Sequence, residues 1–447
     1  MKKASVLFNF FILGMVASHS NAQQLNTLTQ AEKKLDKLAA KPPMGYNSFD
    51  SYGIADEETS KKLIDVMAEK YLPFGYDCFV LDFGWYYEEE NDKYITNDYG
   101  VPEPSKKLYP NGIKSLADYA HQKGLKFGLH LMRGVLKYAL DKNCKVKGTD
   151  ILLKDIIDPR SICTWANFTI GVNMSKPGAQ EYYNSIIDKL ASWGVDFIKY
   201  DDITGQPKEI NAVVKAIEQN GRPIVLSLSP GEDTRLENLP YYQKSNILRI
   251  TSDIWDNQLS LDRSFKAMKE FQGRGFPGFW PDLDMIALGS FPRRKKNEKN
   301  LFTNNQAQTF ITQRAIFASP LIIGGDLLTM DDFTHKLLTN KDMLACNQNG
   351  VTGFQIFNKD STEIYLAPNK TADTKGWVAI FNRKSRSQTI KLKKSDFGFE
   401  YFREVLNVLV KDYRFHDIWN QKDLVLKKFL QFTIPANGVV FAEYSEL

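Results

Sequence analysis

The stretch Asp196-Phe197-Ile198-Lys199-Tyr200-Asp201 is a short, mostly apolar run that ends on a carboxylate. Before it, at 178–193, and after it, at 208–220, apolar residues recur at three- and four-residue spacing. That spacing predicts two amphipathic helices, and the short run between them predicts a buried strand. The region is therefore expected to form a strand flanked by helices, which is the repeating unit of a parallel sheet.

The same alternation of short apolar runs and amphipathic segments continues from residue 43 to about residue 345. The predicted strands are 44–49, 78–83, 126–131, 196–201, 223–228, 247–251, 278–280 and 320–323. The clearest predicted helices are 57–71, 113–123, 178–193, 208–220, 259–273 and 305–317. Eight such units predict an α/β fold in which a (β/α)₈ TIM barrel occupies residues 23–345.

Beyond about residue 350 the pattern changes to short runs in which apolar and polar residues alternate. The clearest of these are 363–366, 377–381, 388–392 and 438–444. Alternation of this kind predicts an antiparallel β domain, which we assign to residues 346–447. No repeat or long linker separates it from the barrel, so the two parts are expected to pack rigidly.

The N-terminus has the order of a signal peptide. Lys2 and Lys3 precede an apolar stretch at 4–17, and Ser20-Asn21-Ala22 supplies small residues for cleavage before Gln23. The apolar stretch is too short for a comfortable membrane span, and no cysteine follows the cleavage point to accept a lipid. We therefore expect residues 1–22 to be removed and the protein to be secreted or periplasmic, without a membrane anchor.

Charge and cysteine content exclude several classes of partner. The formal net charge of the 447-residue chain is only +5, so no nucleic acid or other polyanion is expected to bind. The basic run Arg293-Arg294-Lys295-Lys296 lies in a polar loop where solvation is the usual role. The four cysteines lack CxxC spacing, which argues against a zinc site. Two alternatives stay open for them: a disulfide between Cys144 and Cys163, or free buried thiols.

Carboxylates follow most of the predicted strands. In a barrel of this kind the loops at the carboxyl ends of the strands converge on one mouth, where the chemistry takes place. The residues in question are Asp82, Asp201, Asp202, Asp253, Asp282, Asp284 and Asp326.

A single aspartate at a strand end is more often a helix cap or a loop residue, but a set of them is costly. Such a set indicates either a metal site or acid/base chemistry. A metal-dependent hydrolase would normally have histidine ligands, yet the predicted mature chain has only four histidines and no HxH pair. Two carboxylates acting without a metal are typical of glycoside hydrolysis, which we favour.

Several segments resemble motifs of glycoside hydrolase family 27, the α-galactosidases. The segment 42–49 is similar to the PPMGWNSW opening of that family, and Lys199-Tyr200-Asp201 to its KYD motif. The segment from Arg249 to Asp253 resembles the one that carries the acid/base, and 280–285 resembles the WNDPDM block. The resemblance implies a retaining mechanism with no metal or cofactor and a β-sandwich behind the barrel.

The resemblance also implies residue roles. Asp201 would be the nucleophile and Asp253 the acid/base, so that Asp253 is protonated before the first step while Asp201 is charged. Lys199 would bind sugar hydroxyls and help to keep Asp201 ionised, and Arg249 with Asp284 would hold the hydroxyl beside the anomeric carbon. The other expected substrate-binding residues are Tyr46, Asp82, His130 and Met285. Tyr46 could instead be a core residue, and Lys199 and Arg249 could be plain ion-pair partners.

Three departures from the family pattern bear on the substrate. Phe83 replaces one of two carboxylates that grip galactose, Tyr46 replaces a tryptophan, and His130 replaces a tyrosine. An α-galactoside in an oligosaccharide or polysaccharide is the leading expectation. A β-L-arabinopyranoside, an α-N-acetylgalactosaminide and an α-glucan are alternatives within the same chemistry. A barrel that binds carbohydrate without hydrolysing it is a different class that also stays open, as does the oligomeric state.

Overall fold

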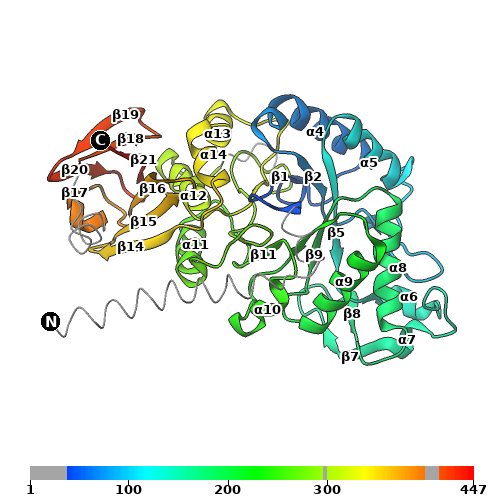
Figure 1. The fold of residues 1–447 in the computed structure, drawn as a ribbon. Coiled ribbons are helices and arrows are strands. Elements are labelled where there is room, and N and C mark those ends of the chain that lie inside the picture. Colours follow the sequence, from blue (N-terminus) through cyan, green and yellow to red (C-terminus); the bar gives the residue numbers. More distant parts are fainter. Residues whose placement is uncertain (1–37, 295–299, 398–411) are drawn as a thin grey trace, which may run out of the picture.

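Parallel strands and helices alternate from Met44 to Ile323 in the computed structural model, which describes residues 38–294, 300–397 and 412–447. The predicted signal peptide and the lysines of the basic run lie outside these residues. Figure 1 shows the barrel on one side of the molecule and a separate group of antiparallel strands on the other.

The barrel strands form one eight-stranded parallel sheet in the described chain, in the order β12-β11-β10-β9-β5-β2-β1-β13. Their bounds are β1 (Met44–Asn47), β2 (Cys78–Leu81), β5 (Lys126–Met132), β9 (Phe197–Asp201), β10 (Val225–Leu228), β11 (Ile247–Arg249), β12 (Trp280–Asp282) and β13 (Leu321–Ile323). The segment after β12 closes the ring, because the Ile286 N–H donates to the Ile322 carbonyl at 2.7 Å. The predicted barrel is confirmed, and each predicted strand end lies within two residues of the observed one.

The six predicted helices are also present. They are α4 (Glu57–Lys70), α5 (Gly112–Gln122), α8 (Ala179–Ser192), α9 (Pro207–Asn220), α11 (Gln258–Phe271) and α12 (Asn304–Ile316). Shorter helices are α3 (Phe49–Tyr52), α6 (Lys137–Asp141), α7 (Leu153–Ile156), α10 (Leu239–Tyr242), α13 (Asp332–Leu338) and α14 (Lys341–Gln348). Capping fixes the starts of two of the long helices. At α4 the Asp56 carboxylate accepts from the Thr59 N–H, and at α12 Thr303 with Gln306 forms a capping box.

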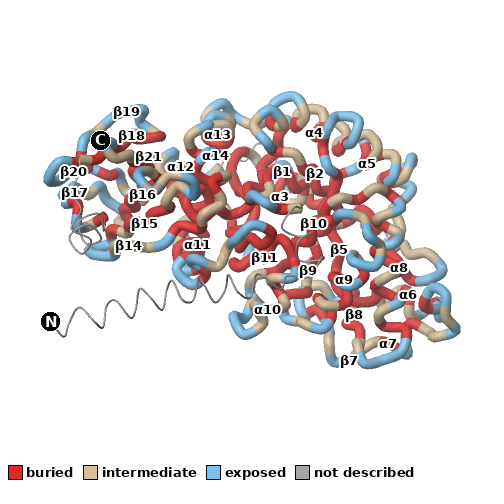
Figure 2. The backbone as a smooth tube through the Cα atoms, viewed as in Figure 1, coloured by how far each residue is buried: buried red, intermediate tan, exposed pale blue. Residues whose placement is uncertain are grey.

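Figure 2 shows that buried residues run through the central strands, including β1, β2 and β11. Packing between β1 and β2 is tight enough to require Gly45. A Cβ atom at that position would lie 2.3 Å from the Cys78 carbonyl oxygen on the neighbouring strand. This close approach explains the glycine in the segment 42–49.

Two insertions at the carboxyl ends of the barrel strands were not predicted. A short hairpin of β3 (Tyr87–Glu88) and β4 (Lys93–Tyr94) follows β2. A three-stranded sheet follows β5, built from β6 (Val135–Leu136), β8 (Thr169–Val172) and β7 (Ile157–Ile162). The segment between β7 and β8 reaches the mouth of the barrel.

In the described residues of the C-terminal part, antiparallel strands form a six-stranded sheet, β14-β15-β16-β21-β18-β19, and a two-stranded sheet, β17-β20. The bounds are β14 (Phe354–Lys359), β15 (Thr362–Asn369), β16 (Ala372–Asn382), β17 (Gln388–Lys393), β18 (Tyr413–Asp417), β19 (Lys422–Leu426), β20 (Phe429–Ile434) and β21 (Val439–Glu446). Side chains from both sheets, among them Ile380, Leu392 and Phe432, share one apolar cluster. The predicted β-sandwich is confirmed.

Helix α12 joins the two parts. It packs on β15, β16 and β21, and Phe381 and Phe441 of the β domain belong to the same apolar core as the barrel. The Trp419 indole N–H donates to Thr312 Oγ1 at 2.9 Å. Helix α14 spans the predicted boundary at residue 345 and ends at Gln348, so the change of architecture falls at 349–353.

All four cysteines are buried free thiols. The Cys144–Cys163 disulfide offered as one alternative is therefore wrong, and the other alternative, free buried thiols, is observed. None of the helices in the described residues is both long and apolar enough to cross a bilayer.

Candidate active site

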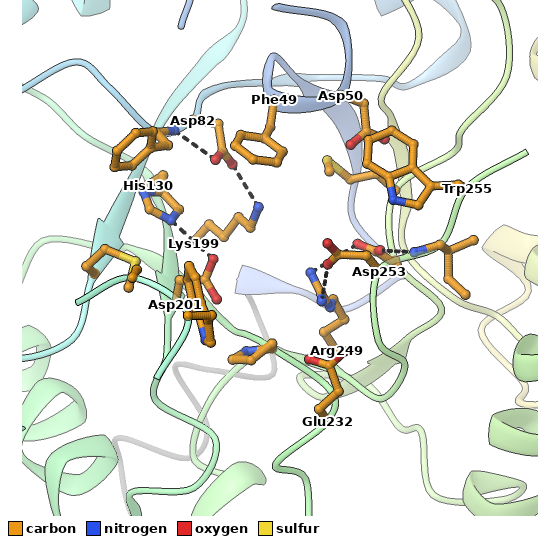
Figure 3. A pocket seen from close by; sticks show the side chains of 18 of the residues that line it. Phe49, Asp50, Asp82, His130, Lys199, Asp201, Glu232, Arg249, Asp253 and Trp255 are labelled. Atoms are coloured by element: carbon orange, nitrogen blue, oxygen red, sulfur yellow. Dashed lines mark hydrogen bonds and ion pairs between the residues drawn. The ribbon is translucent and has the colours of Figure 1, made fainter. Parts of the chain in front are cut away.

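A cavity of about 590 Å³ opens at the carboxyl ends of the barrel strands. Figure 3 shows acidic and basic side chains that point into it from several strands. Its lining includes Phe49, Asp50, Asp82, Phe83, His130, Met132, Trp165, Phe168, Lys199, Asp201, Glu232, Arg249, Asp253, Trp255, Asp284, Met285 and Arg293. The volume lies within the range of ordinary small-molecule sites.

Four of the seven strand-end aspartates line this cavity, namely Asp82, Asp201, Asp253 and Asp284. The other three have structural partners. Asp202 forms an ion pair with Arg133 at 2.8 Å, and Asp282 accepts the Asp284 N–H at 3.0 Å. Asp326 accepts hydrogen bonds from Tyr52 and from Thr329 in its own loop. These three aspartates therefore have the structural role that is usual for a single carboxylate at a strand end.

Asp201 stands at the end of β9 with a donor on each carboxylate oxygen. The Asp202 backbone N–H donates to Oδ1 at 3.0 Å, and Nε2 of His130 lies 3.3 Å from Oδ2. Burial alone would raise the pKa of the Asp201 carboxyl. The His130 hydrogen bond and the charges of Lys199 and Arg249 outweigh burial and hold that pKa well below its ordinary value. Asp201 is therefore a carboxylate at neutral pH.

Asp82 and Lys199 form a buried ion pair on the same side of the cavity. Lys199 Nζ lies 2.8 Å from Asp82 Oδ2, which also accepts the side-chain amide of Asn47 at 2.6 Å. Burial alone would lower the pKa of Lys199, but the charges of Asp82 and Asp201 outweigh it and raise that pKa. Both members of the pair are thus charged, and both line the cavity where a sugar hydroxyl could reach them.

Arg249 links the acids on the opposite side. Its Nη2 lies 2.7 Å from Asp253 Oδ1, and its Nη1 lies 3.5 Å from Asp284 Oδ1. The Ile254 backbone N–H fixes the other Asp284 oxygen at 2.9 Å. The exposed fraction of the Asp253 side chain is 64%, against 7% for Arg249 and 6% for Asp284. Asp253 therefore meets solvent, and the groups that hold it do not.

The structure separates the predicted binding residues into two sets. Asp82, His130, Lys199, Arg249, Asp284 and Met285 all line the cavity with Asp201 and Asp253. Tyr46 does not: it is fully buried and its ring stacks on Phe79 with centroids 5.7 Å apart. Its alternative role as a core residue is the observed one. Phe49, at the start of α3 just beyond β1, lines the cavity instead.

Several lining residues were not predicted. Trp165 and Phe168 come from the insertion between β7 and β8, which sequence patterning did not reveal. Glu232 lies four residues beyond the end of β10. Its position after a predicted strand was a signal by which the sequence could have identified it. Phe83 packs edge-to-face on His130, with centroids 6.0 Å apart, and also contacts Phe168. One wall of the cavity is consequently apolar.

Three family models match the chain. A melibiase model matches residues 23–222, an α-galactosidase A model matches 157–349, and a model of the α-galactosidase C-terminal β-sandwich domain matches 359–443. The chain is 27% identical to α-galactosidase A of Cellvibrio japonicus, over 94% of this chain and 96% of the relative. It is 28% identical to an α-galactosidase of Cyamopsis tetragonoloba, over 81% and 78% respectively.

Solved structures are similar over nearly the whole chain. A family 27 β-L-arabinopyranosidase from Geobacillus stearothermophilus is 32% identical, with a TM-score of 0.85, over 92% of this chain and 98% of that one. A Bacillus halodurans protein assigned as an α-N-acetylgalactosaminidase is 29% identical, with a TM-score of 0.79, over 90% and 97%.

Proposed function

Because the chain belongs to glycoside hydrolase family 27, we propose that it is a retaining exo-glycosidase that releases terminal α-D-galactosyl residues. Asp201 is the nucleophile and Asp253 the acid/base. The observation that carries the proposal is the contrast between these two acids in one cavity. Asp201 is enclosed and held as a carboxylate, whereas Asp253 is open to solvent. The Cellvibrio and Cyamopsis relatives, both α-galactosidases, support the choice of sugar.

In the first step Asp201 attacks the anomeric carbon of the sugar. The bond from that carbon to the glycosidic oxygen breaks, and Asp253 gives its proton to the departing oxygen. The product is an ester between the sugar and Asp201, together with the released alcohol. Donors on both carboxylate oxygens hold Asp201 in place for the attack.

In the second step a water molecule attacks the anomeric carbon and Asp253 takes a proton from it. The ester bond breaks, Asp201 leaves as a carboxylate, and the sugar regains its original configuration after two inversions. The exposure of Asp253 suits this step, because the residue must meet water after the first product has left. Meanwhile Asp82 with Lys199, and Arg249 with Asp284, offer charged partners for the sugar hydroxyls.

The first experiment is hydrolysis of a panel of nitrophenyl glycosides by the purified enzyme. Asp201→Asn should abolish turnover and leave the circular dichroism spectrum unchanged. Asp253→Asn should still form the ester from nitrophenyl substrates, whose leaving groups need little protonation, and added azide should restore turnover. Asp233→Asn, an exposed neighbour that does not line the cavity, is the matched control. Full activity of Asp201→Asn, or a product of inverted configuration, contradicts the proposal.

A β-L-arabinopyranoside is a second candidate substrate. This sugar presents the ring hydroxyls of α-D-galactose but lacks the exocyclic hydroxymethyl group. Phe83, Phe168 and Met132 give the cavity an apolar wall that has no hydrogen bond for such a group, and the Geobacillus relative acts on this sugar. The ratio of kcat/KM values for the two nitrophenyl glycosides decides between them. Phe83→Asp should shift that ratio toward the galactoside, since it restores an acceptor.

We also propose that the protein is exported. Lys2, Lys3 and the apolar stretch at 4–17 support this, as does the small-residue segment before Gln23. Expression of the full chain in a Gram-negative host, followed by N-terminal sequencing of the periplasmic and medium fractions, tests the proposal. A mature N-terminus near Gln23 is the expected result. Retention of Met1 in a cytoplasmic fraction would contradict it.

A further inference from the structure

Asp50 is a lining residue of the cavity that has no part in the two-step reaction. It lies in α3 and is 2% exposed, yet its side chain reaches the cavity surface. Figure 3 shows it across the cavity from Asp201. Its Oδ2 atom is buried and has no hydrogen-bond partner among the described residues. A buried carboxyl oxygen without a partner is rare in proteins and calls for an explanation.

The space that the Asp50 carboxyl group occupies depends on a glycine in the neighbouring loop. Gly324 follows β13, and a Cβ atom there would lie 2.4 Å from Asp50 Oδ2, so any other residue would push the carboxyl away. The neighbouring Ser51 hydroxyl donates to the Gly324 carbonyl, which ties α3 to the end of β13. The Arg293 N–H donates to the Ser51 carbonyl at 2.8 Å and fixes α3 from the other side. The backbone next to Asp50 is therefore anchored beside the cavity.

The charges around Asp50 favour its neutral form. Burial raises the pKa of the Asp50 carboxyl well above its ordinary value, and the negative charges of Asp284, Asp253 and Asp82 add to the effect. Lys199 acts in the opposite direction, but its ammonium is paired with Asp82 at 2.8 Å. A protonated carboxyl has one O–H donor and a carbonyl acceptor, which is the same pair of functions that a sugar hydroxyl has.

We propose that Asp50 is a sugar-binding residue of this cavity, and that a ring hydroxyl of the bound glycoside is the missing hydrogen-bond partner of its carboxyl group. The inference rests on the proposed glycosidase function and deepens it. Two observations carry it: Asp50 lines the cavity although its buried Oδ2 has no partner among the described residues, and Gly324 leaves the room that this carboxyl group occupies. Asp50 Oδ2 is the one carboxylate oxygen among the buried side-chain atoms that lack a hydrogen-bond partner in the described residues.

The test compares wild type, Asp50→Ala and Asp50→Asn on a nitrophenyl glycoside and on analogues that each lack one ring hydroxyl. On the complete sugar, Asp50→Ala should lower kcat/KM by roughly 10- to 100-fold, the range for one buried hydrogen bond left unmade. On the single analogue that lacks the partner hydroxyl, the same substitution should change kcat/KM less than about threefold. Asp50→Asn keeps the shape and the neutral charge, so it should stay within about tenfold of wild type.

Stability gives a second readout. Since the carboxyl has no partner in the free protein, Asp50→Ala should unfold at the same temperature as wild type or higher, while it loses activity. An equal loss on every analogue, or unchanged activity on the complete sugar, would overturn the inference. The inference would also be overturned if Asp50→Ala unfolded at a much lower temperature but discriminated between the complete sugar and its analogues as wild type does. If the alanine variant does not fold, Asp50→Ser carries the same comparison with a shorter side chain.

If the protein is not a glycosidase at all, the experiment gives a different result. In that case wild type hydrolyses none of the glycosides, and calorimetry with the free sugar and its deoxy analogues replaces kinetics. Sugar binding that weakens in Asp50→Ala only when the partner hydroxyl is present supports the role of Asp50 without any turnover. Identical affinities of wild type and variant, or no binding by wild type, would refute it.

Discussion

Replacing His130 by phenylalanine tests how the nucleophile is held. The substitution keeps a ring of similar size against Phe83 but removes the donor that lies 3.3 Å from Asp201 Oδ2. Asp201 then keeps one hydrogen bond, from the Asp202 backbone N–H. Because the lost bond stabilises the carboxylate form, its loss raises the pKa of Asp201. Protonated Asp201 cannot attack, so activity in acid should fall first.

The size of the effect follows from the geometry. A hydrogen bond to a charged group contributes about 1.5–3 kcal/mol, and at 3.3 Å this one belongs at the weaker end. About 1.4 kcal/mol corresponds to one pKa unit and to a factor of ten in rate. The acid limb of kcat/KM should therefore move up by roughly one pH unit, while kcat/KM near the optimum, where Asp201 stays ionised, should change little.

The assay is kcat/KM on a nitrophenyl glycoside from the most acidic pH at which the enzyme stays folded up to about pH 7, which reports the groups of the free enzyme. His130→Asn retains a neutral donor and should give a smaller shift than His130→Phe. His121→Asn is the matched control, because His121 pairs with Asp196 outside the cavity. If His130→Phe lowers activity equally at every pH, histidine acts on something other than the ionisation of Asp201 and the reasoning is refuted.

Three further substitutions test the framework around the site. Gly45→Ala should cost about 1–3 kcal/mol in the free energy of unfolding, measured with denaturant, because its Cβ would meet the Cys78 carbonyl; an unchanged value would contradict the close packing. Arg133→Met should cost about 3–5 kcal/mol by the same measurement, since it leaves the buried carboxylates of Asp202 and Glu209 without a cation. Burial, with the charge of Asp284, raises the pKa of Asp282 to about 7. Folded protein then binds a proton that the unfolded chain releases near pH 4, so stability falls as pH rises toward 7. Asp282→Asn should flatten that fall between about pH 4 and about pH 7, and equal slopes for both proteins would speak against it.

The barrel was predictable because its signals are local and regular. Each strand is a short apolar run and each long helix has an apolar stripe, so 196–201 and 178–193 could be assigned from their own residues. The insertion after β5 was missed because β6 has only two residues and β7 has no buried residue, which leaves neither length nor apolar pattern to detect. Elements of this kind form only where the barrel supports them.

The residues of the site also differ in whether the local sequence could predict them. Asp201 and Asp253 follow predicted strands, as do Asp202, Asp282 and Asp326, so position indicated a site and the family motifs distinguished the first two. Tyr46 and Phe49 are both aromatic and three residues apart, so only the turn from β1 into α3 decides which of them meets the cavity. Asp50 was hidden for a different reason: its seat depends on Gly324, far away in the sequence.

Helix α12 has a consequence for how this protein can be altered. Apolar side chains on several of its faces are buried, some against the barrel and others against β16 and β21. A chain cut after the barrel would expose to water the apolar side chains of α12 that pack on β16 and β21. The β domain is therefore not a detachable module: barrel and sandwich should melt together in a single transition, and grafting either one onto another protein would require redesign of α12.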